Sequence, residues 1–133
     1  MTPEARAHLD TACLSLIKAQ AGLRASAVEP SLAENAARDA YYVAFHAAHA
    51  LIVERTGREP KTHAGVHRQF HRLTVDEPGM AQPLRDFLIR AYDFKAVADY
   101  ATVPPPRISV ERASRAVETA EKFLAAVNEL LEP

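Results

Sequence analysis

The sequence predicts an all-α protein, an antiparallel up-and-down bundle of four to five helices. Alanine dominates an apolar content of 48%, and alanine favours helix more than any other residue. Apolar residues recur at spacings of three and four through long segments. Proline and glycine fall between these segments, and no stretch reads convincingly as a strand. Long amphipathic helices with short connections pack side by side as a bundle.

The first helix is expected from Pro3 to about Arg24. Thr2 can cap its N-terminus, and proline suits the first turn because its missing N–H leaves no hydrogen bond unmade. The apolar spacing gives this segment one inward face, on which Cys13 is expected to be a core residue. The residues of that face are Leu9, Cys13, Leu16, Ala19 and Leu23.

The second helix is expected from about residue 31 to Thr56. Ser31 and Glu34 match the S-x-x-E capping box directly after Pro30. Gly57 follows the last periodic residue, as glycine often does at a helix C-terminus. One face carries small side chains, which let a neighbouring helix come close. That face consists of Ala37, Ala40, Ala44, Ala48 and Leu51.

Three more helices complete the predicted bundle. The third begins near Thr62, and the DEPG sequence at 76–79 ends it. The fourth is expected at 82–100. Three prolines at 104–106 then force an extended connection, because proline lacks the helix donor and disfavours helix in the residue before it. The fifth helix begins after a Ser109 cap.

Length and composition limit the classes of protein. One domain is expected for residues 1–133. The 16 basic and 17 acidic residues give a net charge of -1, which argues against a strongly basic nucleic-acid binder but leaves a local basic patch open. A single cysteine cannot form an internal disulfide. We therefore expect a cytoplasmic protein without membrane contact, because no run has the length of a membrane span and the N-terminus does not resemble a signal peptide.

The run RDAYYVAFHAAHA, residues 38–50, is apolar but keeps an arginine and two histidines. At 100° per residue, Arg38, Tyr42, Phe45 and His49 fall within about 60° of one another, with His46 to one side. A buried guanidinium needs a partner. Sequence therefore predicts that this face of the second helix meets a carboxylate on another helix.

The fourth helix offers that carboxylate. Lys95 and Asp99 lie four residues apart, and we expect Arg38 to pair with Asp99, with Tyr42 or Tyr100 completing the hydrogen bonds. Three interpretations stay open: a lock between two helices, a dimer surface, or a cleft that takes a phosphate on Arg38 and a base on a tyrosine or His49. The candidate cleft residues are Arg38, Tyr42, His46, His49, Lys95, Asp99 and Tyr100.

The third helix carries His63, His67 and His71 at a spacing of four, so these residues follow one side of the helix. H-x3-H can hold zinc, but the segment has no HExxH, cysteine pair or obvious carboxylate ligand, and we expect no metal and no cofactor. The favoured interpretation is a surface or interfacial histidine ladder. The alternative is an anion or RNA contact, made by Lys61, His63, His67 and Arg68.

Three segments in order, RDAYYVAFHAAHALI, KTHAGVHRQF and YDFKAVADY, resemble HEPN domains, named for higher eukaryotes and prokaryotes nucleotide binding. The similarity is greatest to small bacterial and archaeal HEPN proteins. It implies an all-α bundle that is usually dimeric. Many members are toxins of toxin–antitoxin pairs, beside a minimal nucleotidyltransferase. Active members cut RNA without metal through a late R-x4–6-H motif, whose arginine holds the scissile phosphate and whose histidine moves protons.

The sequence departs from this motif in the segment FKAVADY. Lys95 stands where related small proteins usually have arginine, and Asp99 stands near the place of the catalytic histidine. The last histidine of the chain is His71. A carboxylate would repel the scissile phosphate and does not replace an imidazole at pH 7. A literal R-x4-H does occur at Arg58–His63, in a proline-containing loop where chance matches are common.

We therefore expect a nucleotide- or partner-binding HEPN module that lacks the usual nuclease site. It would form a homodimer and could be one component of a toxin–antitoxin-type pair with a nucleotidyltransferase, with a nucleotide or RNA as ligand. The alternative is a metal-independent ribonuclease, a toxin that uses Arg38 with His46 or His49.

Overall fold

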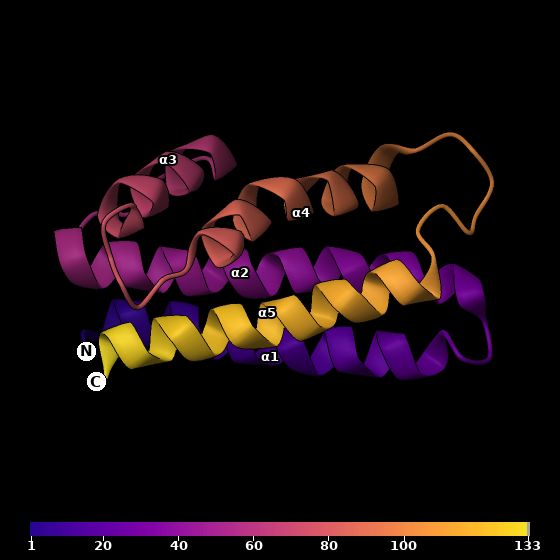
Figure 1. Cartoon of the computed structure of the whole chain (residues 1–133), viewed down its shortest axis with the longest axis horizontal. Helices are drawn as coiled ribbons and strands as arrows, with labels where there is room; N and C mark the ends of the chain where they lie inside the picture. Colours follow the sequence, from indigo (N-terminus) through magenta and orange to yellow (C-terminus); the bar gives the residue numbers. More distant parts are fainter. Residues whose placement is uncertain (133) are drawn as a thin grey trace.

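The computed structural model describes residues 1–132 and contains five α-helices, one 3-10 turn and no strand in that range (Figure 1). The predicted all-α class is confirmed. No helix among these residues combines the length and apolar character that a membrane span needs. The elements are α1 (Pro3–Ala25), η1 (Pro30–Leu32), α2 (Ala33–Thr56), α3 (His63–Thr74), α4 (Gln82–Tyr100) and α5 (Val110–Leu131).

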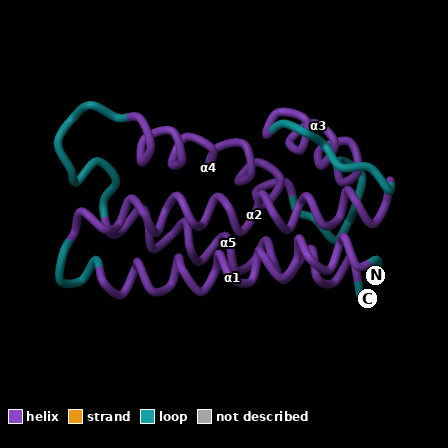
Figure 2. The backbone as a smooth tube through the Cα atoms, turned by 180° about the vertical axis from the view of Figure 1, so that it is seen from behind, coloured by secondary structure: helices purple, strands orange, loops and turns teal. Residues whose placement is uncertain are grey.

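Four long helices run lengthwise with alternating direction along the chain (Figures 1 and 2). Helix α2 lies at the centre and packs against all four other helices. The short helix α3 covers the C-terminal half of α2 at one end of the bundle, the end at which both termini also lie (Figure 1). The C-terminal end of α2, the N-terminal end of α3 and the N-terminal end of α1 therefore share one end of the molecule.

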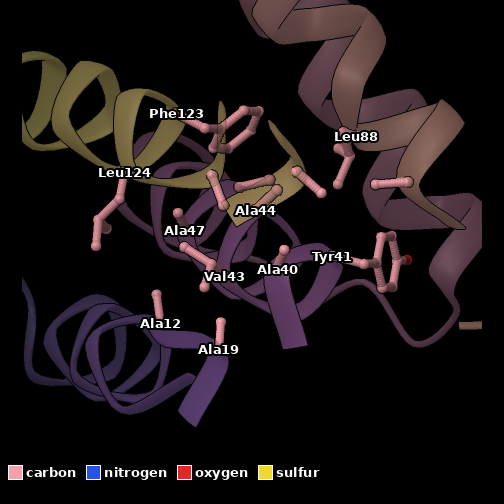
Figure 3. Close-up of a cluster of buried hydrophobic side chains, with 14 of the residues drawn as sticks. Ala12, Ala19, Ala40, Tyr41, Val43, Ala44, Ala47, Leu88, Phe123 and Leu124 are labelled. Atoms are coloured by element: carbon pink, nitrogen blue, oxygen red, sulfur yellow. The ribbon is translucent and has the colours of Figure 1, made fainter. Parts of the chain in front are cut away.

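Small side chains set the spacing of the core. Ala40, Ala44 and Ala47 of α2 are fully buried, as are Ala12 and Ala19 of α1 (Figure 3). Alanine lets two backbones approach closely while still removing apolar surface from water. Larger side chains fill the space toward α3, α4 and α5. The largest of them are Tyr41, Phe70, Phe123, Leu51 and Ile52.

Local sequence signals fix most helix ends as predicted. The hydroxyl of Thr2 accepts a hydrogen bond from the Ala5 N–H at 3.1 Å, and Thr62 does the same for Gly65 at 2.9 Å. Each bond satisfies one of the N–H groups that a helix N-terminus leaves unpaired. Gly57 ends α2 with a φ of 70°, a left-handed conformation that glycine adopts without steric cost.

The predicted capping box of α2 is wrong. Ser31 lies inside η1, and its hydroxyl donates to Glu29 at 2.8 Å instead of capping α2. Glu34 is buried and bonds Arg107, whose Nε lies 2.9 Å from Oε2 of the carboxylate. The ion pair with a distant arginine is stronger than a bond to a backbone N–H, so the carboxylate turns away from the helix end.

The prediction that Cys13 is a core residue is also wrong. Cys13 is exposed, and Leu14 and Ile17 beside it are 50% and 61% exposed. Leu9 and Ala19 of the predicted face are buried, but Ala12, one position before Cys13, is buried in place of the cysteine. Helix α1 therefore presents an apolar strip to solvent on the face opposite its core contacts.

Candidate functional site

The predicted pair between α2 and α4 forms, but at the surface. Arg38 Nη1 lies 3.5 Å from Asp99 Oδ1, and the side chains are 35% and 28% exposed. Lys95 Nζ lies 3.0 Å from the other carboxylate oxygen. These hydrogen bonds, first that of Lys95 and then that of Arg38, hold the pKa of Asp99 below its usual value. The expectation of a guanidinium inside the bundle was wrong, since the Arg38 side chain keeps 35% of its surface exposed.

Two tyrosines border this pair. The ring of Tyr100 is 74% exposed, and Lys95 Nζ lies 5.3 Å from its centroid, within range of a cation–π contact. Tyr42 stacks on His46, with centroids 5.7 Å apart, and burial raises the pKa of its hydroxyl. We call Arg38, Tyr42, Lys95, Asp99 and Tyr100 the α2–α4 polar surface.

The two histidines of α2 do not contact the ion pair. His49 is about 16 Å along the helix from Arg38 and faces α1, where its ring stacks on His8 at 3.9 Å. His46 is half-buried, and burial lowers the pKa of its imidazole to about 4. Its Nδ1 is buried and has no hydrogen-bond partner among the described residues. The structure thus brings five of the seven predicted cleft residues together, places His46 beside them through its contact with Tyr42, and separates His49 from them.

The histidines of α3 meet a tyrosine that sequence reasoning missed. The Tyr41 hydroxyl lies 2.7 Å from His63 Nδ1 and 2.8 Å from His67 Nε2, and with its single hydrogen it can donate to only one of the two rings. Phe45 stacks on His63 at 4.4 Å. Burial lowers the pKa of both imidazoles and raises that of Tyr41. These two histidines of the predicted surface or interfacial ladder are therefore not free at the surface but lie at the contact between α3 and α2.

A sequence signal for Tyr41 does exist. It lies on the face of α2 that carries Ala37, Ala44 and Ala48, the face that packs into the core. A tyrosine at such a position needs a hydrogen-bond partner for its hydroxyl. The histidines four residues apart on the next helix are suited to that role.

The remaining basic residues of this region line a pocket of about 400 Å³ between the end of α2 and α3. Its cations are Arg58, Lys61, Arg68 and Arg72, all exposed. None of them forms an ion pair with residues 1–132. Glu59 is the one acidic residue in the lining. We call this feature the basic pocket.

Only two of the four residues that were predicted to contact an anion line the basic pocket. Lys61 and Arg68 line it, whereas His63 does not and bonds Tyr41 instead. The pocket also lies beside Thr62 and Gly65 at the N-terminus of α3. A helix N-terminus carries unpaired N–H groups and a partial positive charge, which both favour an anion. Arg58 and Arg72 were not predicted, because their convergence depends on how the 57–62 connection folds over α3.

Comparisons with known proteins agree with this helical architecture. A family model described as the HEPN domain matches residues 5–130. The chain is 31% identical over 103 residues to a protein of Methanocaldococcus jannaschii named "Putative toxin MJ0605". The match covers 77% of this chain and 74% of that protein.

Proposed function

The chain belongs to the HEPN domain family, and from that premise we propose that it is a nucleotide- or RNA-binding module of a toxin–antitoxin-type pair, which holds a ligand phosphate in the basic pocket. The observation that carries this proposal is the charge of the pocket. Four cationic side chains surround it, and its one carboxylate, Glu59, is engaged by His8 and His49. Guanidinium groups bind phosphate oxygens in pairs of parallel hydrogen bonds.

The α2–α4 polar surface is the weaker candidate for the phosphate. Both of its cations, Arg38 and Lys95, already contact Asp99, so an incoming phosphate would compete with a carboxylate and be repelled by it. A phosphate that enters the basic pocket would not have to displace a carboxylate from the cations that line it. The polar surface does offer the exposed ring of Tyr100, on which a base could stack.

Binding without cleavage fits the placement of the histidines. The ribonuclease alternative pairs Arg38 with His46 or His49, which lie about 12 Å and 16 Å from it along α2. Both imidazoles are thus two or more helical turns from Arg38, and neither contacts its guanidinium among the described residues. Arg58 and His63 also act separately, since Arg58 lines the basic pocket and His63 bonds Tyr41. These separations support a binding module over a nuclease.

Two binding measurements test the basic pocket. Fluorescence anisotropy gives the affinity for a labelled single-stranded RNA, and calorimetric titration gives the affinity for ATP. Arg58→Ala and Arg68→Ala should each weaken binding about tenfold, because each removes a charge-assisted hydrogen bond. Arg24→Ala is the matched control, since Arg24 is exposed near the far end of α1, and it should leave affinity unchanged. Equal binding by the pocket variants, with loss in Arg38→Ala, would place the ligand on the α2–α4 polar surface instead.

A cleavage assay separates the two functions. The same RNA, incubated with the protein and a chelator, should remain intact. Cleavage that disappears in both Arg38→Ala and His46→Ala would favour the metal-independent ribonuclease.

A homodimer and a nucleotidyltransferase partner belong to the same proposal. The exposed strip of Leu14 and Ile17 on α1 supports an interface, because contiguous exposed apolar side chains mark sites of association. Sedimentation should give a dimer for the unmodified chain and a monomer for Ile17→Glu. Co-expression with a minimal nucleotidyltransferase, followed by affinity capture of either protein, tests the partner.

A further inference from the structure

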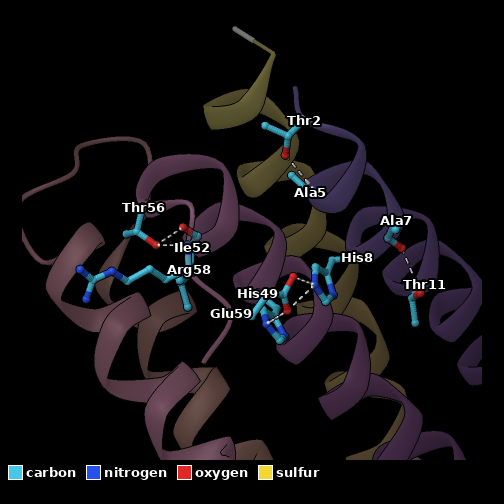
Figure 4. Close-up of polar contacts among 10 residues, drawn as sticks. All are labelled: Thr2, Ala5, Ala7, His8, Thr11, His49, Ile52, Thr56, Arg58 and Glu59. Carbon is cyan, nitrogen blue, oxygen red and sulfur yellow. Dashed lines mark hydrogen bonds and ion pairs between the residues drawn. The ribbon is translucent and has the colours of Figure 1, made fainter. Parts of the chain in front are cut away.

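Three metal-ligating side chains from distant parts of the chain converge beside α2. They are His8 of α1, His49 of α2 and Glu59 of the connection between α2 and α3 (Figure 4). One ligand atom from each lies within 4.8 Å of the other two. The carboxylate lies beside the Nε2 edges of the two stacked rings, at 2.9 Å and 3.1 Å from His8 Nε2 and 3.0 Å from His49 Nε2. Both imidazoles therefore present the same nitrogen to this carboxylate.

Burial distinguishes this cluster from a surface ion pair. His49 is only 8% exposed, and its Nε2 is buried. Although this atom is 3.0 Å from Glu59, the contact lacks hydrogen-bond geometry, and Nε2 has no other partner among the described residues. A buried nitrogen whose one polar contact is a poorly oriented ion pair is left without a proper hydrogen bond, which is unfavourable unless something binds it. The ring stacks on His8, with centroids 3.9 Å apart and planes 15° from parallel.

We propose that His8, His49 and Glu59 form a binding site for a divalent transition metal, with zinc as the ion that the donors fit best. Two imidazole nitrogens and one carboxylate oxygen are a donor set that zinc accepts, at about 2.0–2.2 Å from each donor. Oε2 of Glu59 already lies 3.1 Å and 3.0 Å from the two Nε2 atoms, close to the donor spacing of a tetrahedral zinc site, roughly 3.4 Å for these bond lengths. Because zinc lies in the plane of an imidazole that binds it, the two rings would have to turn out of their parallel stack. Glu59 is 53% exposed, so it can move, and a water molecule can fill the fourth position.

Bound zinc would join three segments that otherwise meet through side-chain contacts. The ion would tie the start of α1 and the 57–62 connection to the C-terminal half of α2. Because the unfolded chain does not hold these three groups together, binding would stabilise the folded state. Glu59 also lines the basic pocket, but His8 and His49 do not, so His8→Ala tests zinc binding without altering that pocket's lining.

Calorimetric titration of chelator-treated, re-dialysed protein with zinc chloride at pH 7.5 tests the proposal. We expect one zinc per chain and a higher melting temperature with zinc. His8→Ala and Glu59→Gln, both at partly or fully exposed positions, should fold and bind zinc more than about tenfold more weakly. His71→Ala is the matched control, an exposed histidine of α3 outside the cluster, and it should bind as the unmodified chain does.

Two outcomes would overturn the proposal. One is the absence of zinc binding by the unmodified chain at pH 7.5. The other is unchanged zinc affinity in His8→Ala and Glu59→Gln, which would mean that the ion binds elsewhere, for example at His63 and His67. Affinity should also fall as the pH is lowered to about 5.5, because zinc binds only the deprotonated imidazole.

Discussion

At the residue scale, His46 makes stability depend on pH. Its ring packs against Tyr42 and Phe45 of α2, and positive charge on His8, His49 or His63 opposes its protonation. Burial is the largest cause of the fall in its pKa from 6.5 to about 4. Between these values the unfolded chain binds a proton that the folded chain does not, so stability falls as the pH is lowered from 6.5 toward 4.

His46→Phe should remove this part of the pH dependence. The phenyl ring keeps the stacking area and eliminates the unpaired buried Nδ1. Urea unfolding at pH 7 and pH 5 should show the unmodified chain losing about 1 kcal/mol more than the variant, a figure reduced for the partial exposure of the ring. An equal loss in the two proteins would assign the pH dependence to the other histidines.

The substitution Asp99→Ala tests whether the ion pairs of the α2–α4 polar surface are exposed to solvent. Asp99→Ala should cost about 1 kcal/mol or less, because an exposed ion pair is screened by water and salt. Urea unfolding at low and high salt measures this. A loss of about 3 kcal/mol or more would instead indicate a buried pair with one charge left unpaired.

At the element scale, α3 is held to α2 by a hydroxyl group as well as by apolar packing. Tyr41→Phe leaves His63 Nδ1 and His67 Nε2 without the partner they share, and we expect a loss of about 1–3 kcal/mol in unfolding free energy. Tyr42→Phe is the matched control at the next position, whose ring stacks on His46, and its effect should be smaller. Faster amide exchange confined to α3 in Tyr41→Phe would localise the effect.

The helix ends show how much of the structure local sequence predicts. Thr2, Thr62 and Gly57 act within one helical turn, so local sequence was enough to place those helix ends. The position of Glu34 could not be predicted in this way, because its partner Arg107 is 73 residues away. The contact between His8 and Glu59 was not predicted for the same reason. Each looks like an isolated surface residue until α1, α2 and their connections are folded together.

At the scale of the whole molecule, Arg107 fastens the long connection after α4 to the beginning of α2. Besides Glu34, its guanidinium donates to the carbonyl oxygens of Ala101 at 2.8 Å and Val103 at 3.3 Å. The hydrogen bond from Arg107 lowers the pKa of the Glu34 carboxyl from 4.5. A depressed folded-state pKa means that this contribution to stability is present above pH 4.5 and is lost as the pH falls through the lower value.

Glu34→Gln should therefore lower the melting temperature at pH 7 by more than Asp99→Ala does. The difference between Glu34→Gln and the unmodified chain should shrink as the pH falls below 4.5. Calorimetric melting at pH 7 and pH 3.5 measures both effects. A constant difference at the two pH values would exclude the ionised carboxylate as its source.

Both termini emerge beside each other at the end of the bundle that carries the basic pocket (Figure 1), where Arg6 near one terminus pairs with Glu132 near the other at 2.9 Å. A short peptide could bridge them, and the chain could be reopened between Val103 and Pro104, which are exposed. Such a circularly permuted protein should keep the same five helices. It would also move any affinity tag or fluorophore to the far end, away from the basic pocket.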